Sequence, residues 1–308
     1  MKRTVPRELP VLLVLALIFV VLALVAPQFF DRKPMMSRLA QEAPVLIVTA
    51  GTAIVIIARQ IDISVGSQFA VCGVIAGMLA ANGSSLAVCA VAAIGAGALM
   101  GAINGVFVSM LRLPSIVVTL ATMVIWREAL RLKQQGQFIN LPAGYQWFGF
   151  PLATGQTVEI VTAIVVFGVL AWVVARLSAG RFVYAVGSDA EAARLAGISP
   201  RTTTFGVFVL LGILCGLAAF LNALQTPQVD PKSGTGLEMK VIAAAVVGGI
   251  AVSGGRGRLW GAFLGLLLLT TINPALPYLH IEAYWEKAIQ GTIVLLAVAA
   301  ESVRSKRS

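Results

Sequence analysis

The sequence contains few charged residues. They account for 12% of its 308 residues, whereas hydrophobic residues account for 58%. A soluble globular protein carries about a quarter charged residues, and the mean hydropathy here is +0.92. So few charges cannot cover a surface that faces water. The composition therefore predicts an integral membrane protein, and it excludes both a soluble enzyme and a disordered chain.

Histidine and cysteine are also scarce. His280 is the single histidine, and the three cysteines, Cys72, Cys89 and Cys215, each stand alone in an apolar run. Isolated cysteines of this kind usually act as small buried apolar residues and do not form a disulfide or a metal site. The sequence has no Walker A motif and no Cys-His, Ser-His or paired-carboxylate pattern. We therefore expect no metal, no cofactor and no catalytic residue in this chain.

The positive charge has an ordinary explanation in a membrane protein. The formal net charge is +10, which in a soluble protein would suggest a nucleic-acid partner. In a membrane protein, lysine and arginine in the loops set the orientation, with the larger share on the cytoplasmic side. We therefore expect contact with membrane lipid and none with nucleic acid.

Ten apolar segments are long enough, or nearly so, to cross a bilayer as helices of about 20 residues. They cover residues 9–27, 42–58, 66–82, 85–109, 114–131, 157–177, 204–224, 238–253, 258–276 and 285–301. The segments form one transmembrane domain over residues 1–308. If both termini lie in the cytoplasm, more lysine and arginine residues lie on the cytoplasmic side than outside, as the positive-inside rule requires. A cleaved signal peptide is the alternative for the first segment.

Two sets of glycines share one spacing. Membrane helices associate closely at small residues, and a glycine recurs every fourth position in the fourth and ninth segments. The glycines are Gly97, Gly101 and Gly105, and Gly257, Gly261 and Gly265. These two segments cross the membrane in opposite directions, so the pattern predicts an inverted repeat of segments two to five and seven to ten. Plain helix packing is the alternative.

The loop over about residues 178–203 has the markings of a short helix outside the membrane. Ser188 suits the N-cap, with Glu191 three residues later completing a capping box. Asp189 stands in the first turn, where the helix dipole favours a negative charge. Gly197 suits the C-terminal turn, and Pro200 prevents continuation. We expect a two-turn cytoplasmic helix that inserts into a groove on another protein; a helix resting on lipid headgroups is the alternative.

Asp62 lies beside apolar sequence, where an ionised carboxylate is energetically expensive. Arg59 is close enough in sequence to pair with it. Asp62 could cap the third helix together with Ser64 or Ser67, position a translocation path, or couple transport to ions or protons.

Five other polar residues within the segments are candidates to line a solute path, because amides and hydroxyls can bind passing hydroxyl groups. They are Asn104, Thr119, Thr122, Asn222 and Asn273. The alternative for each is a hydrogen bond between helices. Glu238 and Lys240, near one end of the eighth segment, could pair with each other or face the path.

Several stretches together resemble one family. They cover residues 61–66, 101–105, 113–123, 186–198 and 238–257. In these stretches the chain resembles the permease subunits of bacterial ATP-binding-cassette (ABC) importers for monosaccharides, which include importers of ribose, xylose, arabinose, rhamnose and autoinducer-2. The resemblance implies an all-α integral membrane protein of the bacterial inner membrane. It also implies about ten transmembrane helices in the type II, vitamin-importer-like architecture.

The resemblance also implies partners and site residues. The predicted helix would bind a separate ATPase subunit, a periplasmic binding protein would deliver the solute, and a second permease chain, alike or different, would complete the path. The coupling residues would be Ser188, Asp189, Glu191, Ala192, Ala193, Arg194 and Gly197. The chain departs from the family at residues 58–60, where two glycines often precede the Asp motif. A branched-chain amino-acid ABC permease and an ion-coupled secondary transporter are the alternative functions.

Overall fold

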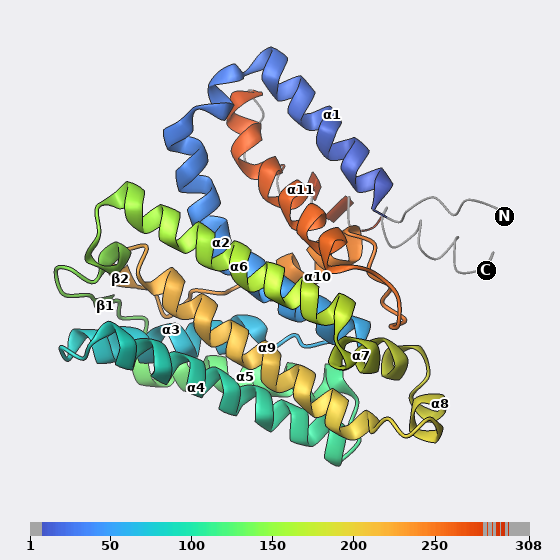
Figure 1. The fold of residues 1–308 in the computed structure, drawn as a ribbon. Helices are drawn as coiled ribbons and strands as arrows, with labels where there is room; N and C mark the ends of the chain where they lie inside the picture. Colours follow the sequence, from blue (N-terminus) through green and yellow to red (C-terminus); the bar gives the residue numbers. More distant parts are fainter. Residues whose placement is uncertain are drawn as a thin grey trace.

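The computed structural model describes residues 8–279 and residues 282, 285, 288, 289, 291, 292 and 295. This part of the chain is almost entirely helical (Figure 1). Its α-helices are α1 (Leu9–Val25), α2 (Arg32–Ile57), α3 (Val65–Ala81), α4 (Leu86–Gly105), α5 (Ser115–Gln134), α6 (Leu152–Arg176), α7 (Ser178–Ser188), α8 (Ala190–Leu195), α9 (Pro200–Ala223), α10 (Leu237–Val247) and α11 (Leu259–Tyr278). Two 3-10 turns, η1 (Pro27–Phe30) and η3 (Gln146–Gly149), and a π-helical turn, η2 (Val106–Met110), complete the helical structure.

The helices confirm the membrane class. Four of them, α2, α4 with its π-helical extension, α6 and α9, are long and apolar enough to cross a membrane, and α1, α3 and most of α11 are shorter apolar helices. Nine of the predicted segments overlap helices in the structure: α1 to α6 and α9 to α11. The tenth, 285–301, lies mostly outside the described residues, as do both chain termini.

The eighth predicted segment is wrong in extent. It was expected over residues 238–253, but α10 ends at Val247. Gly248 and Gly249 follow, and Gly249 has a φ of 89°, a left-handed conformation that ends an α-helix readily. The 11 residues of α10 rise only about 16 Å, against a hydrocarbon core of about 30 Å. Residues 248–258 therefore continue as an irregular loop.

A small sheet departs from the all-α expectation. Strand β1 (Ile139–Asn140) pairs antiparallel with β2 (Gln228–Val229). The pair joins the α5–α6 connection to the segment after α9. Figure 1 shows this β1–β2 clip at the opposite end of the molecule from α8.

The first glycine set brings two helices into backbone contact. A Cβ atom at Gly97 would collide with the carbonyl oxygen of Gly212 on α9, and one at Gly101 with that of Phe208. Helices α4 and α9 therefore approach each other as closely as small residues allow.

The second set forms only part of the expected stripe. Gly261 and Gly265 hold α11 against Gly248 and Ala244 of α10 in the same way. Gly257, however, has a φ of 128° and lies in the loop before α11, against Ile250. The reason is that the helix begins only at Leu259.

Helix contacts repeat in a pattern. Helices α2 and α9 are the most buried of the long spans and contact each other. Helix α3 packs on α4 and on α9, while α10 packs on α11 and on α2. The α4–α9 contact has its counterpart in the contact of α11 with α2.

Candidate functional site

The predicted cytoplasmic helix is α8, which follows α7 with a single residue between them. Its N-cap is Asp189, whose Oδ1 accepts the amides of Glu191 at 2.9 Å and Ala192 at 3.0 Å. The predicted Ser188 capping box is wrong, because Ser188 ends α7 and Asp189 has the extended backbone of a cap. Glu191 instead forms an ion pair with Arg194 at 2.6 Å.

The C-terminal end of α8 forms as expected. Gly197 has a φ of 82°, and the amide of Ile198 donates to the carbonyl of Ala193 at 2.9 Å. This is the bond that closes a helix with glycine in the left-handed conformation. Ser199 then caps α9, with Pro200 in its first turn.

Most of the predicted coupling residues lie on the exposed surface of α8 and of the residues that flank it. Ser188, Asp189, Glu191, Ala192, Arg194 and Gly197 are exposed. Ala193 is buried, so it seats the helix on its own chain and is not available to a partner. Leu195, which the sequence reasoning missed, is 76% exposed. A single leucine in a helix of small residues was the available signal.

Two carboxylates, one at the N-cap of α8 and one in its first turn, are stabilised in their charged form. The amides of Ala192 and Glu191 hold the pKa of Asp189 below its ordinary value. The hydrogen bond from Arg194 likewise lowers the pKa of Glu191. Both groups are therefore ionised at neutral pH, and α8 presents a fixed pattern of charges to the solvent.

Helices α7 and α8, which we call the arm, contact two other segments at Gly187. We call Gly187, Ile57 and Gly255 the arm junction. The amide of Gly255 donates to the carbonyl of Ile57 at 2.8 Å. A Cβ atom at Gly187 would lie 2.8 Å from the nitrogen of Gly255 and would collide with the oxygen of Ile57. Nearby, the Tyr184 hydroxyl donates to the carbonyl of Gly257 at 2.7 Å. The arm therefore contacts the end of α2 and the α10–α11 loop directly.

The turn after α2 contains an unusual residue. Arg59 has a φ of 63°, a conformation that glycine adopts without strain and a long side chain rarely does. This is the place where the resembling family often has glycine. Arg59 does not pair with Asp62 as the sequence allowed. Its charge instead helps to lower the pKa of Asp189, after the larger effect of the backbone amides.

Asp62 is fully buried and accepts four hydrogen bonds. Its Oδ1 accepts the backbone amide of Ser64 at 2.8 Å and the Ser64 hydroxyl at 2.6 Å. Its Oδ2 accepts Nε2 of Gln68 at 3.2 Å and Nδ2 of Asn104 at 3.3 Å. Asp62 thus ties the turn before α3 to α3 itself and to α4, and Ser64 is its local partner, as one alternative predicted.

Asn104 extends this group of residues to α5. Its Nδ2 also donates to the Ser64 hydroxyl at 2.8 Å, and its Oδ1 accepts the Thr122 hydroxyl at 2.9 Å. Thr119, one turn earlier on α5, accepts the amide of Ile63 at 3.1 Å.

Four of the path candidates therefore converge in one buried set, the Asp62 cluster, together with two residues that were not candidates. The cluster is Asp62, Ser64, Gln68, Asn104, Thr119 and Thr122. Five of its side chains bond to one another, and the Thr119 hydroxyl bonds to the backbone of Ile63, so the cluster joins the 61–64 turn, α3, α4 and α5. This is the interhelical bonding given above as the alternative for Asn104, Thr119 and Thr122. Gln68 was missed, although its position one turn into α3 places it beside Asp62.

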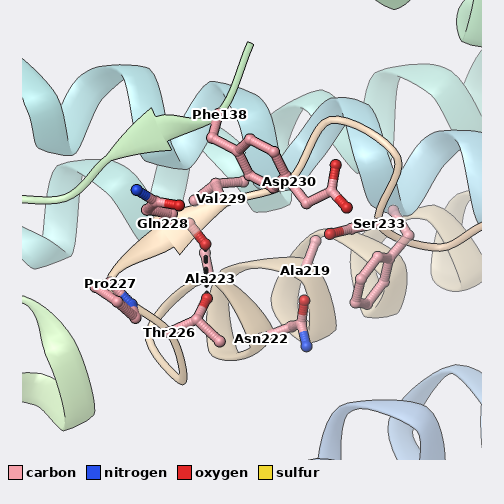
Figure 2. A pocket seen from close by; sticks show the side chains of 12 residues that line it. Phe138, Ala219, Asn222, Ala223, Thr226, Pro227, Gln228, Val229, Asp230 and Ser233 are labelled. Carbon is pink, nitrogen blue, oxygen red and sulfur yellow. Dashed lines mark hydrogen bonds between the residues drawn. The ribbon is translucent and has the colours of Figure 1, made fainter. Parts of the chain in front are cut away.

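The remaining two path candidates lie elsewhere. Asn222, near the end of α9, lines a pocket of about 400 Å³ under the β1–β2 clip (Figure 2). Asn273 belongs to α11, and its side chain lies outside the described residues.

Glu238 and Lys240 do not pair with each other. Glu238 lies 3.7 Å from Arg127 of α5, and Lys240 lies 2.8 Å from Glu42 of α2. The short helix α10 is thereby tied by opposite charges to two longer helices.

Comparison with known proteins matches the chain to transport permeases. Residues 35–298 match the family described as branched-chain amino acid transport system / permease component. The chain is 38% identical to the autoinducer 2 import system permease protein LsrC of Enterobacter sp. (strain 638), over 94% of this chain and 84% of that protein. It is 39% identical to LsrC of Escherichia coli (strain K12 / DH10B), over 92% and 84%, and 34% identical to LsrC of Salmonella typhi, over 94% and 84%. No solved structure matches the chain.

Proposed function

The chain belongs to the family of branched-chain amino acid transport system permease components, and from that premise we propose that it forms the solute path of an ATP-driven bacterial importer. Membership makes it a multi-pass membrane permease, a transport component rather than an enzyme. ATP hydrolysis would then occur in a separate ATPase subunit, since the sequence has no Walker A motif.

The proposed solute is sugar-like: autoinducer 2, a pentose or a rhamnose-like deoxysugar. Relatives named for autoinducer 2 import align with nearly the whole chain at 34–39% identity. The description of the family names branched-chain amino acids instead. An amino-acid solute is therefore the second candidate.

One observation carries the ATP-driven mechanism: α8 is a capped helix that presents charged and small residues to the solvent beyond the membrane helices. We propose that this surface fits a groove on the ATPase subunit, the way in which short helices bind grooves generally. Asp189, Glu191 and Arg194 would supply its polar contacts and Leu195 an apolar one.

The arm junction gives a physical route from α8 into the membrane. Because Gly187 contacts Ile57 and Gly255 through backbone atoms, a movement of the arm displaces the end of α2 directly. Residues 58–64 follow α2, and the Asp62 cluster ties them to α3, α4 and α5. ATP-driven closure of the ATPase subunits would thus shift a connected set of helices between two arrangements.

Within this mechanism we assign the Asp62 cluster a structural role, as a joint between helices. The residues are buried and joined by hydrogen bonds, and Oε1 of Gln68 is the one buried polar atom of the cluster without a partner among the described residues. Of the six polar residues that the sequence offers as candidates for the solute path, Asn222 and Asn273 remain the proposed path residues.

The repeated helix contacts support the inverted repeat of the type II architecture with ten spans. Under that repeat, segments two, three and four correspond to segments seven, eight and nine, which are α2, α3 and α4 against α9, α10 and α11. The contacts α3–α4, α3–α9 and α4–α9 then correspond to α10–α11, α10–α2 and α11–α2, all of which occur. Repeats of this kind are common in transporters.

We further propose that α8 and both termini lie in the cytoplasm of a bacterium, on the inner side of its plasma membrane. Arg176, Arg181 and Arg201 flank α8 in the sequence and Arg194 lies within it, as the positive-inside rule requires. The β1–β2 clip would then face the periplasm, where a binding protein would dock. A second permease chain, identical or different, would complete the path.

The test is transport by the chain reconstituted in proteoliposomes with its ATPase subunit and binding protein. We expect uptake that requires ATP, and we expect Glu191→Lys to abolish it while the protein still inserts in the membrane. Glu128→Lys is the matched control, because Glu128 forms the same kind of exposed ion pair, with Arg131 at 3.3 Å.

Two results would contradict the proposal. The first is uptake driven by an ion gradient without any ATPase subunit, which would favour a secondary transporter. The second is equal transport by Glu191→Lys and the unmodified chain, which would remove α8 from the mechanism.

A further inference from the structure

The pocket that Asn222 lines lies at the end of the molecule opposite α8. Its floor is formed by the buried residues Ala219, Ala223 and Val229, and its rim by the exposed Phe138 and Gln228. Pockets that bind small molecules typically have volumes of about 300–1,000 Å³, and this one is about 400 Å³. It is therefore large enough for a small solute and open at its rim.

Three polar side chains surround the opening from two segments. Figure 2 shows the Asp230 carboxylate and the Ser233 hydroxyl on the loop after β2, and the Asn222 amide on α9. Oδ1 of Asp230 accepts the amide of Lys232 at 2.8 Å, which fixes the carboxylate. Within the described residues its Oδ2 has no bonding partner and is free to accept. The pocket thus offers a carboxylate, an amide and a hydroxyl, which together donate and accept hydrogen bonds.

Two aromatic rings complete the lining. Phe69 reaches the pocket from α3, and Phe138, 57% exposed, stands at the rim beside β1. Aromatic rings offer a flat, rigid apolar surface. The C–H face of a small ring compound can pack on such a surface while its hydroxyl groups bond to the polar side chains.

The charges of the lining select among solutes. Among the described residues, the lining includes one carboxylate and neither lysine nor arginine. The ammonium of a free amino acid could pair with Asp230, but its carboxylate would enter the site without a cation of the lining to balance it. An anion would be repelled by Asp230. A neutral polyol fits, because hydroxyl groups donate strong hydrogen bonds to a fixed carboxylate.

We propose that this pocket receives a small, uncharged, polyhydroxylated solute, with Asn222, Asp230 and Ser233 binding its hydroxyl groups. The proposal rests on the proposed function, because it makes the pocket the first site on the permease to take the solute from the binding protein.

Site-directed labelling tests occupancy of the pocket. Cys72, Cys89 and Cys215 are all buried, so Ser233→Cys introduces one accessible thiol for a membrane-impermeant maleimide. In the assembled complex we expect D-ribose, L-rhamnose or autoinducer 2 to slow this labelling, and L-leucine to leave it unchanged. The unmodified chain gives the background rate. Protection by none of the three polyols, or by L-leucine alone, would overturn the proposal.

Transport kinetics provide a second measurement. We expect Asn222→Leu and Asp230→Asn each to raise the KM for uptake of the protecting solute by about tenfold, the effect of one lost hydrogen bond of about 1.4 kcal/mol. The kcat should change little, since neither residue contacts α8. The controls are Asn82→Leu and Asp31→Asn, the same substitutions at exposed positions outside the pocket.

The two proposals fail differently. If the unmodified complex shows no ATP-dependent uptake, the proposed function fails. If it imports a polyol and the pocket variants keep the KM of the unmodified chain, the pocket assignment alone is wrong.

Discussion

Replacing Asn104 with leucine separates the two roles that a polar residue in a membrane helix can have. Asn104 donates to Asp62 at 3.3 Å and to Ser64 at 2.8 Å, and it accepts from Thr122 at 2.9 Å. Leucine has a similar size and makes none of these bonds. If the cluster is a joint between helices, the variant is less stable; if Asn104 instead serves the solute, its main effect is on transport.

The structure sets the magnitude. Hydrogen bonds between membrane helices contribute about 0.6 kcal/mol each on average and up to about 1.7 kcal/mol, so the loss of three such bonds costs about 2 kcal/mol. Asp62 additionally loses one of its donors while it stays buried, and a buried polar group left with fewer partners costs about 1–3 kcal/mol more. We therefore expect Asn104→Leu to reduce the free energy of unfolding by about 3–5 kcal/mol.

The assay is reversible unfolding of the purified chain in mixed micelles. The double-mutant cycle of Asn104→Leu with Thr122→Val should give a coupling energy of about 0.6 kcal/mol. Asn222→Leu is the matched control, because Asn222 is half-buried and its side chain makes one long bond within the described part of the chain, 3.5 Å to Gln225. It should lower stability by about 0.5 kcal/mol or less. Equal destabilisation by Asn104→Leu and Asn222→Leu would refute the joint.

Three further predictions concern the arm and α10. Gly187→Ala should leave binding of the ATPase subunit unchanged, because α8 itself is intact. It should reduce ATP-dependent uptake at least about tenfold, a barrier increase of about 1.4 kcal/mol, because the added methyl group forces the arm junction apart. Unchanged uptake with normal binding would exclude the arm junction as the route from α8 to the membrane helices. The pKa of Asp189 lies below its ordinary 3.8, so the cap stabilises α8 fully above pH 3.8 and is lost only as the pH falls through the lowered pKa. Hydrogen exchange at the amides of Glu191 and Ala192 should therefore stay slow until the pH reaches the lowered pKa. Loss of protection at a higher pH would contradict the cap. Lys240→Met should lower the free energy of unfolding by less than about 1 kcal/mol, and the loss should depend on salt, because the ion pair of Lys240 with Glu42 is partly exposed. A larger loss that does not depend on salt would mean that the pair is desolvated.

The positions of the helices could be predicted from the sequence, because a bilayer imposes a length and an apolar composition on each span. The residues at which the helices end were harder to predict. The short α10 depends on Gly249 adopting a φ of 89°, which a hydropathy pattern does not register. Strands of two residues, such as β1 and β2, have no periodicity from which they could be predicted.

The cap of α8 shows a different limit. Ser188 and Asp189 are both good N-cap residues, so their order in the sequence does not decide between them. The decision comes from tertiary contact: Gly187 and Ser188 pack against Gly255, which holds them in α7 and leaves Asp189 as the first residue free to leave the helix.

The sequence predicted most members of the Asp62 cluster one by one, but it did not predict that they bond to one another. Asp62, Asn104 and Thr122 lie far apart in the sequence, and their bonds depend on how α3, α4 and α5 pack. Sequence alone can say that each is polar in an apolar span. It cannot say that the partners are protein rather than solute, because an amide or a hydroxyl binds both.

Burial divides these polar residues by role. In the Asp62 cluster the bonding groups largely satisfy one another, so a passing solute would have to break bonds within the protein in order to bind. In the pocket, Asp230 is fixed by one bond, and its second oxygen has no partner among the residues that the structure describes, so a solute hydroxyl binds without such a loss. A joint must persist while the helices move, and a solute site must exchange its partner in every cycle. The same transport cycle therefore requires both kinds of polar site, and it requires them to be separate, as the Asp62 cluster and the pocket below the clip are.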